Sequence, residues 1–164
     1  RTFANIVASA APSHLHRIEQ TGPAWKMRFN DLASAKTTAH RDLYFSEYFH
    51  SFGQDLEKVD FFITVDGQKE TLFDPNLPPA ITTTQGAVEE WRIENRTQEV
   101  HEFHMHQIHF LVTAIDDVPV PRRKQQLFDL YQVGYWDGNA EHPYPSITVK
   151  LDFRGPDVGD FVYH

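Results

Sequence analysis

Residues 146–153 read Ser-Ile-Thr-Val-Lys-Leu-Asp-Phe, with an apolar side chain at every second position. Successive side chains of a β-strand point to opposite faces, so these apolar side chains would share one face of an extended segment. Such an alternation is typical of a strand with one face in a core and the other toward solvent. The apolar positions of this predicted strand are Ile147, Val149, Leu151 and Phe153.

Strand-like patterns also occur in the rest of the chain from residue 41 onward. Residues 59–65 and 127–133 are rich in β-branched and aromatic side chains. The pair Asp66-Gly67 after the first of them predicts a hairpin turn, and the uneven alternation of residues 86–95 predicts a bulge. Helical periodicity over three turns is absent from this part of the sequence. Many short strands separated by turns predict an all-β sandwich or barrel.

Length, composition and charge limit the classes of protein to consider. A chain of 164 residues that is 40% hydrophobic can bury a real core and form one domain. Its 15 basic and 23 acidic residues give a net charge of −8, which argues against nucleic acid or an anionic membrane as partner. The absence of cysteine excludes disulfides and thiolate metal ligands within these residues.

The domain division is predicted from a change of character near residue 41. Residues 1–40 are rich in Ala, Ser and Thr, and Pro12, Gly22 and Pro23 interrupt any long element. We expect residues 1–40 to be a linker or the tail of a preceding domain. Residues 41–164 are then the main domain.

Four of the ten histidines lie within residues 101–109, which read His-Glu-Phe-His-Met-His-Gln-Ile-His. On a strand, His104 and His106 would project from one face, whereas His101 would project from the other. Neutral imidazole is the commonest protein ligand for metals near neutral pH. One short strand could therefore serve two different metal sites.

Packing is the alternative interpretation of these histidines. An imidazole on a strand can simply fill space, but burying several of them is costly unless each is hydrogen-bonded or ligated. We interpret His109, at the end of the run, as structural. A second His-x-His pair, His14 and His16, lies in an irregular segment and is a weak candidate for metal binding.

Several of these segments together resemble the carboxy-terminal cupredoxin domain of multicopper oxidases, the laccase-like enzymes. Residues 101–106 are similar to the HPxHxH signature of that family, with Glu102 in the place of its Pro. Residues 152–164 are similar to the lead-in to its HCHxxxH motif, and residues 61–67 and 84–91 resemble bacterial members. The resemblance covers about residues 41–164 and implies a cupredoxin-like Greek-key β-sandwich.

The resemblance also implies copper ligands, position by position. His101 matches a ligand of the mononuclear blue copper, so we expect it near solvent, where electrons enter. His104 matches a ligand of the solitary copper in a trinuclear cluster. His106 and His164 match ligands of the binuclear pair in that cluster. Asp129, Asp152 and Asp160 are candidates for fixing the orientation of these imidazoles.

The activity implied is that of a copper oxidase. Such an enzyme takes single electrons from a small reducing substrate (a phenol, an amine or a metal ion) and reduces dioxygen to water. The family pattern places a blue-copper cysteine directly after the position of His164, and further histidines on an amino-terminal cupredoxin domain of the same or a neighbouring chain. We therefore expect the 164 residues alone to be inactive, and a periplasmic or secreted location for the parent protein.

Two other functions are compatible with the histidine motif. One is a copper-binding or electron-transfer cupredoxin without oxidase activity, which the sequence beyond residue 164 would distinguish. The other is a cupin-like metalloenzyme on a β-barrel, whose metal is held by His-x-His plus a carboxylate. That option requires a Glu or Asp close to His104 and His106.

Overall fold

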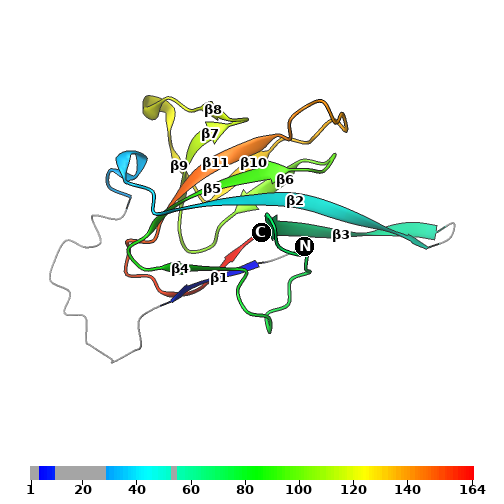
Figure 1. The fold of residues 1–164 in the computed structure, drawn as a ribbon, viewed down its shortest axis with the longest axis horizontal. Helices are drawn as coiled ribbons and strands as arrows, with labels where there is room; N and C mark the ends of the chain where they lie inside the picture. Colours follow the sequence, from blue (N-terminus) through cyan, green and yellow to red (C-terminus); the bar gives the residue numbers. More distant parts are fainter. Residues whose placement is uncertain (1–3, 10–28, 53–54) are drawn as a thin grey trace.

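The computed structural model describes residues 4–9, 29–52 and 55–164. In these residues the chain forms strands and two short 3₁₀ turns (Figure 1), which confirms the all-β prediction. The strands are Ala4–Ser9 (β1), Ala39–Phe52 (β2), Asp55–Val65 (β3), Ile81–Thr84 (β4), Val88–Asn95 (β5), His101–His104 (β6), Phe110–Ile115 (β7), Val118–Pro119 (β8), Leu127–Phe128 (β9), Leu130–Val133 (β10), Ser146–Asp152 (β11) and Gly159–Tyr163 (β12). The 3₁₀ turns are Leu32–Ser34 (η1) and Arg122–Lys124 (η2).

The strands form one large sheet and two small ones. The seven-stranded sheet has the order β3-β2-β5-β11-β7-β8, with β9 also paired to β7. The small sheets have the orders β12-β1-β4 and β10-β6. Most neighbours are antiparallel, whereas β2 with β5 and β1 with β4 are parallel. The core lies between the large sheet and the small sheets, as in a β-sandwich, because its side chains come from all three.

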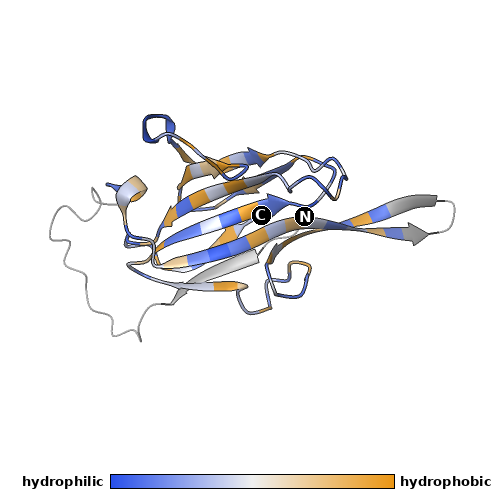
Figure 2. Cartoon of the chain, turned by 45° about the horizontal axis from the view of Figure 1, so that its top comes forward, coloured by the Kyte–Doolittle hydropathy of each residue, from blue (hydrophilic) through white to orange (hydrophobic). Residues whose placement is uncertain are grey.

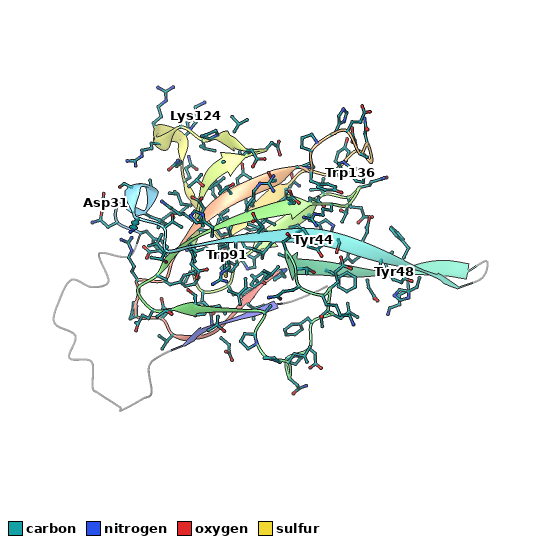
Figure 3. All side chains as sticks on the ribbon, in the orientation of Figure 1. Asp31, Tyr44, Tyr48, Trp91, Lys124 and Trp136 are labelled. Carbon is teal, nitrogen blue, oxygen red and sulfur yellow. The ribbon has the colours of Figure 1, made fainter. Side chains whose placement is uncertain are left out.

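Aromatic side chains fill the centre of the core. Trp91 on β5, Phe103 on β6 and Tyr163 on β12 are fully buried, and Figure 3 shows Trp91 inside the sandwich. The ring centroids of Trp91 and Tyr163 lie 5.4 Å apart at an angle of 73°, an edge-to-face arrangement that aromatic pairs favour. The strands that carry the histidine motif and the end of the chain are thus joined through this cluster.

Strand β11 forms where its alternation predicts it, but both of its faces are covered. Ile147, Val149 and Leu151 are buried in the core as expected. Lys150 on the opposite face is also buried, and its ammonium donates to the carbonyl of Ala35 at 2.8 Å. This second face is covered because the segment around η1 packs over it.

The uneven alternation of β5 has a cause other than the predicted bulge. The pairing of β5 with β11 is regular, and the register shifts of the large sheet lie elsewhere, at Thr148/Val149 and at His50/Phe52. The apolar pattern fails because a polar residue, Glu89, is buried at 2% exposure on the same face as Trp91 and Ile93. Its carboxylate accepts two hydrogen bonds from Arg41, at 2.7 and 2.9 Å, and one from the indole of Trp91 at 2.8 Å.

The hairpin predicted at Asp66-Gly67 was also wrong. Gly67 does make a turn, with φ of 81° and a hydrogen bond from Gln68 N to Val65 O, but the chain then enters a loop to β4. The antiparallel partner of β3 is the preceding strand, β2. This long β2–β3 hairpin extends beyond the rest of the sandwich (Figure 2), and Tyr48 and Phe49 are exposed on it.

Segments before residue 41 also contact the sandwich. Strand β1 pairs with β12 and with β4. Leu32 of η1 is buried against Val88 and Leu111. The division of the chain at residue 41 stays a prediction, and His14 and His16 lie outside the described residues.

Candidate metal centre

Backbone pairing brings the histidine motif next to the end of the chain. His104 N donates to His164 O at 2.8 Å, and His164 N donates to His104 O at 3.0 Å. One residue further along, Met105 and Tyr163 form an isolated antiparallel bridge, and both side chains are buried in the core. The side chains of His104 and His164 therefore project together from the opposite face, away from the core.

Three imidazoles meet on this face. Potential ligand atoms of His104, His106 and His164 all lie within 4.8 Å of one another. Their ring centroids are 4.7 to 5.5 Å apart. This spacing allows metal ions to be shared among the three side chains, which we call the histidine trio. The group contains no carboxylate, which weighs against the cupin-like alternative.

One backbone carbonyl fixes the orientation of His104. Nδ1 of His104 lies 2.7 Å from the carbonyl oxygen of Asp129, which also accepts a hydrogen bond from Met105 N at 2.9 Å. A carbonyl can only accept, so Nδ1 must carry the proton and Nε2 keeps its lone pair. Metal-binding histidines commonly hold their second nitrogen in this way.

The position of that carbonyl comes from a break that the sequence pattern missed. Residues 127–133 were predicted as one strand, but Asp129 separates β9 from β10. The carboxylate of Asp152 does not take the orienting role, because Phe29 N and the Arg154 guanidinium occupy it. For His104, the group that orients the imidazole is therefore the main-chain oxygen of Asp129 and not an acidic side chain.

His101 lies apart from the trio, as strand parity predicts. Its ring stacks on Phe45 at 4.9 Å between centroids and meets Phe61 edge-on at 5.7 Å. His101 is half-buried, and its Nε2 is buried without a hydrogen-bond partner; its role as the electron-entry ligand stays a prediction. Burial lowers the pKa of this imidazole, which favours the neutral form. A buried nitrogen without a hydrogen-bond partner fits a metal ligand.

A cavity of about 550 Å³ separates His101 from the trio. His101, His104 and His164 all border it, and Phe45 and Phe61 form part of its apolar wall. The two predicted metal positions therefore face a common space from different sides.

The turn after His106 holds a residue in an unfavourable backbone conformation. Gln107 has φ of 69°, in the left-handed region, and Ile108 N donates to His106 O at 2.9 Å to close a tight turn. This conformation costs a non-glycine residue roughly 1 to 2 kcal/mol.

Gln107→Gly is therefore expected to stabilise the fold by up to about 1 kcal/mol, because glycine adopts positive φ freely but gains entropy in the unfolded chain. Chemical denaturation of both proteins measures the difference. A loss of more than about 1 kcal/mol, the usual cost of glycine in an ordinary conformation, would contradict the assigned strain.

His109, interpreted from the sequence as structural, and Trp136 both have ring contacts. His109 is exposed and lies outside the trio, in edge contact with the ring of Phe29. Trp136 packs against Tyr144, and its indole N–H donates to the carbonyl of Asn139. These contacts agree with a packing role for each.

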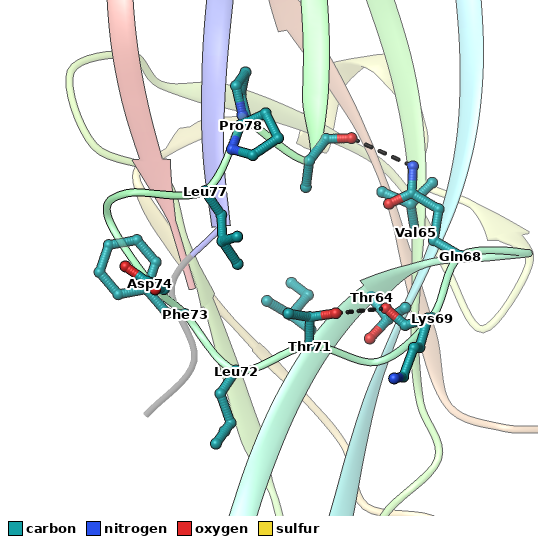
Figure 4. A pocket seen from close by; sticks show the side chains of 13 residues that line it. Thr64, Val65, Gln68, Lys69, Thr71, Leu72, Phe73, Asp74, Leu77 and Pro78 are labelled. Atoms are coloured by element: carbon teal, nitrogen blue, oxygen red, sulfur yellow. Dashed lines mark hydrogen bonds between the residues drawn. The ribbon is translucent and has the colours of Figure 1, made fainter.

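A second cavity, of about 390 Å³, lies under the loop between β3 and β4 (Figure 4). The amide of Gln68 donates to the carbonyl of Ala80 at 3.4 Å at its rim. Its wall is formed largely by apolar and hydroxyl side chains, with Lys69 and Asp74 as the charged ones. It contains no histidine and is separate from the candidate metal centre.

Known protein structures of low sequence identity share this fold. The chain aligns with the blue copper oxidase from Nitrosomonas europaea at a TM-score of 0.55 and 19% identity, covering 78% of this chain and 37% of that one. It aligns with the multicopper oxidase mgLAC at a TM-score of 0.54 and 19% identity, covering 89% of this chain and 40% of that one. It aligns with the multicopper oxidase from Campylobacter jejuni, described as a metallo-oxidase, at a TM-score of 0.50 and 16% identity, covering 73% of this chain and 25% of that one. The chain thus spans less than half the length of each of these structures.

Family membership comes from the sequence match. No curated protein sequence matches the chain significantly. In the described part of the chain, no helix has the length and apolar character needed to cross a membrane. A family model described as multicopper oxidase matches residues 47–164, which include the whole histidine motif and the last strand. With the cupredoxin fold also in place, the chain belongs to the multicopper oxidase family.

Proposed function

We propose that this chain supplies copper ligands to an oxidase that couples one-electron oxidation of a small reducing substrate to the four-electron reduction of dioxygen to water. The observation that carries the proposal is the histidine trio, whose ligand atoms lie within 4.8 Å of one another. Phenols, amines and metal ions are the candidate substrates. The periplasm or the extracellular space is the proposed location.

The donor atoms suit copper. Imidazole is a good ligand for copper. The Asp129 carbonyl engages Nδ1 of His104 and leaves Nε2 as its donor atom for a metal, and Nε2 of His101 is buried without a hydrogen-bond partner. We assign His101 to a mononuclear copper, His104 to the solitary copper of a trinuclear cluster, and His106 with His164 to its binuclear pair. The remaining ligands, including a thiolate, would come from parts of the parent protein outside these residues.

The residues of this chain would hold and shield the metal. The carbonyl of Asp129 fixes the tautomer of His104, and the rings of Phe45 and Phe61 pack against the imidazole of His101. Copper, when bound, would supply the one-electron chemistry that neither imidazole nor the aromatic wall can provide. Backbone pairing of β6 with the end of β12 keeps the trio together.

Copper titration of the chain tests the ligand assignment. Cu²⁺ added to the chain should give an electron paramagnetic resonance signal with nitrogen coupling, and His104→Ala and His106→Ala should each weaken binding. His142→Ala is the matched control, because His142 is exposed and pairs with Asp137 outside the trio. Equal copper binding by all four proteins would argue against the trio.

The chain with copper is also expected to be colourless or pale. The intense colour of a blue copper site requires a cysteine thiolate, and the chain has no cysteine. A visible spectrum of the copper-loaded chain measures this directly. An intense blue band would show that the assigned chemistry of the site is wrong.

A further inference from the structure

We infer that Asn95 is the positioning residue for His101, and this inference rests on the proposed role of His101 as a copper ligand. Asn95 is the last residue of β5 and is fully buried. Its side-chain nitrogen donates to Glu99 O at 2.7 Å and to Gly134 O at 2.8 Å. Its side-chain oxygen accepts from the backbone N–H and the hydroxyl of Thr97, at 3.0 and 2.8 Å. Both donors of the amide are therefore used.

The two carbonyls held by Asn95 flank the start of the β6–β10 sheet. His101 and Val133 are the pair at that end of the two-stranded ladder. Glu99 lies two residues before His101, and Gly134 directly follows Val133. The amide nitrogen of Asn95 thus connects the chain entering β6 with the chain leaving β10. A two-stranded sheet is marginally stable by itself, so such a connection determines where its end lies.

Further contacts join the same two segments. Asn95 N donates to Pro145 O, and Trp136 N donates to Thr97 O, each at 2.8 Å. Gly138 approaches Gln98 so closely that a Cβ atom there would lie 2.6 Å from its side-chain nitrogen. The turn of residues 95–100 and the loop of residues 134–145 are therefore packed as one unit beside His101.

Asn95 also lies next to the aromatic surface on which His101 rests. It is the register partner of Phe45 across the β2–β5 pair, and the ring of Phe45 stacks on the imidazole of His101. The backbone before His101 and the Phe45 ring beneath it are thus both positioned by contacts with the end of β5. The histidine trio depends on different contacts, the pairing with β12 and the carbonyl of Asp129.

Asn95→Asp should displace His101 selectively. Aspartate has the shape of asparagine, but it places an oxygen against the carbonyls of Glu99 and Gly134 in place of the donor nitrogen. Repulsion between these oxygens would open the His101 end of the β6–β10 ladder. Asn139→Asp is the matched control, because it makes the same chemical change at an exposed residue of the neighbouring loop.

Imidazole ring resonances of the metal-free chain, assigned by single His→Gln substitutions, provide the test. In Asn95→Asp, the His101 cross-peak should move and the amide of His101 should lose protection from hydrogen exchange. The cross-peaks of His104 and His106 should stay in place, and Asn139→Asp should change none of the three. A fixed His101 cross-peak, or equal displacement of all three, would overturn the inference.

Thr97→Val is the second variant, in case Asn95→Asp does not fold. It removes the hydroxyl that bonds the oxygen of Asn95 and also contacts the backbone N–H and carbonyl of Glu99, but it keeps both donor contacts of the Asn95 amide. We expect a smaller displacement of the His101 cross-peak, again without change at His104 and His106, and an unmoved cross-peak would count against the inference. Since no copper is present, a failed copper titration with a displaced His101 would reject the proposed function and leave the positioning role standing.

Discussion

His106→Ala in the full-length parent protein is expected to abolish dioxygen consumption while electron uptake from the reducing substrate continues. His106 belongs to the trio, whereas His101 lies apart from it beside Phe45 and Phe61. Loss of His106 removes one of the three imidazoles that this chain supplies to the proposed oxygen-reducing cluster and leaves the proposed electron-entry site intact. The visible spectrum, recorded during anaerobic reduction and after oxygen is added, follows both steps.

His101→Ala should fail in the opposite way. The blue band should be perturbed and substrate oxidation slowed, while the cluster can still be loaded with copper. His109→Ala is the control, since His109 is exposed and outside the trio, and it should retain both steps. Identical spectra and kinetic defects in His101→Ala and His106→Ala would contradict the separate assignments. A parent protein that accepts electrons but never consumes dioxygen would be an electron-transfer module.

Glu89→Ala is expected to reduce the free energy of unfolding by about 3 kcal/mol, the lower part of the range for breaking a buried ion pair. Glu89 is 2% exposed and accepts hydrogen bonds from Arg41 and Trp91. Its removal leaves the indole N–H without an acceptor and the Arg41 guanidinium without its counter-charge. The guanidinium can still reach water, because the Arg41 side chain is 25% exposed.

Chemical denaturation of Glu89→Ala and of Glu90→Ala separates this effect from a general loss of charge. Glu90 is the neighbouring carboxylate, is 30% exposed, and lies 3.3 Å from His40. Exposed pairs of this kind contribute about 1 kcal/mol or less. Equal destabilisation by the two substitutions would contradict the assigned role of the buried pair.

The same carboxylate makes stability depend on pH in acid. Burial alone would raise the pKa of Glu89, but the hydrogen bonds from Arg41 and Trp91 hold it below its usual value. The stabilisation is fully present above the unfolded pKa of about 4.3, and it is lost as the pH falls through the lower folded pKa. Thermal unfolding of wild type and Glu89→Gln between about pH 6 and pH 3, a range that spans the usual pKa of a glutamate carboxyl, should therefore show converging stabilities as the pH falls.

Patterns of alternation predicted those parts of the fold that depend on near neighbours in sequence. The apolar face of β11 is buried as expected, and the parity of residues 101–106 separates His101 from His104 and His106. Both results follow from the two-residue repeat of a strand, which any extended backbone imposes. The assignment of each histidine to a particular copper came only from family resemblance and stays a prediction.

Features that depend on distant contacts could not be predicted in this way. The burial of Lys150 depends on the segment around Ala35, more than a hundred residues earlier in the chain. The burial of Glu89 depends on its pairing with Arg41. The carbonyl of Asp129 leaves no signal in the side-chain pattern, because every residue has one. The hairpin assignment failed because Asp66-Gly67 specifies a local turn but not which strand pairs with β3.

The pairing of His104 with His164 makes the candidate metal centre a product of tertiary structure. His104 at the end of β6 and His164 after β12 lie sixty residues apart in sequence, and the pairing of these two segments brings them together. An ion held by the trio would cross-link these strands. Its binding would stabilise only the folded state, in which the strands are paired. The melting temperature would then rise with the concentration of free copper, as mass action requires for a ligand of the native state. Copper would thus serve as a conformational brace for the carboxyl-terminal strand as well as a redox cofactor.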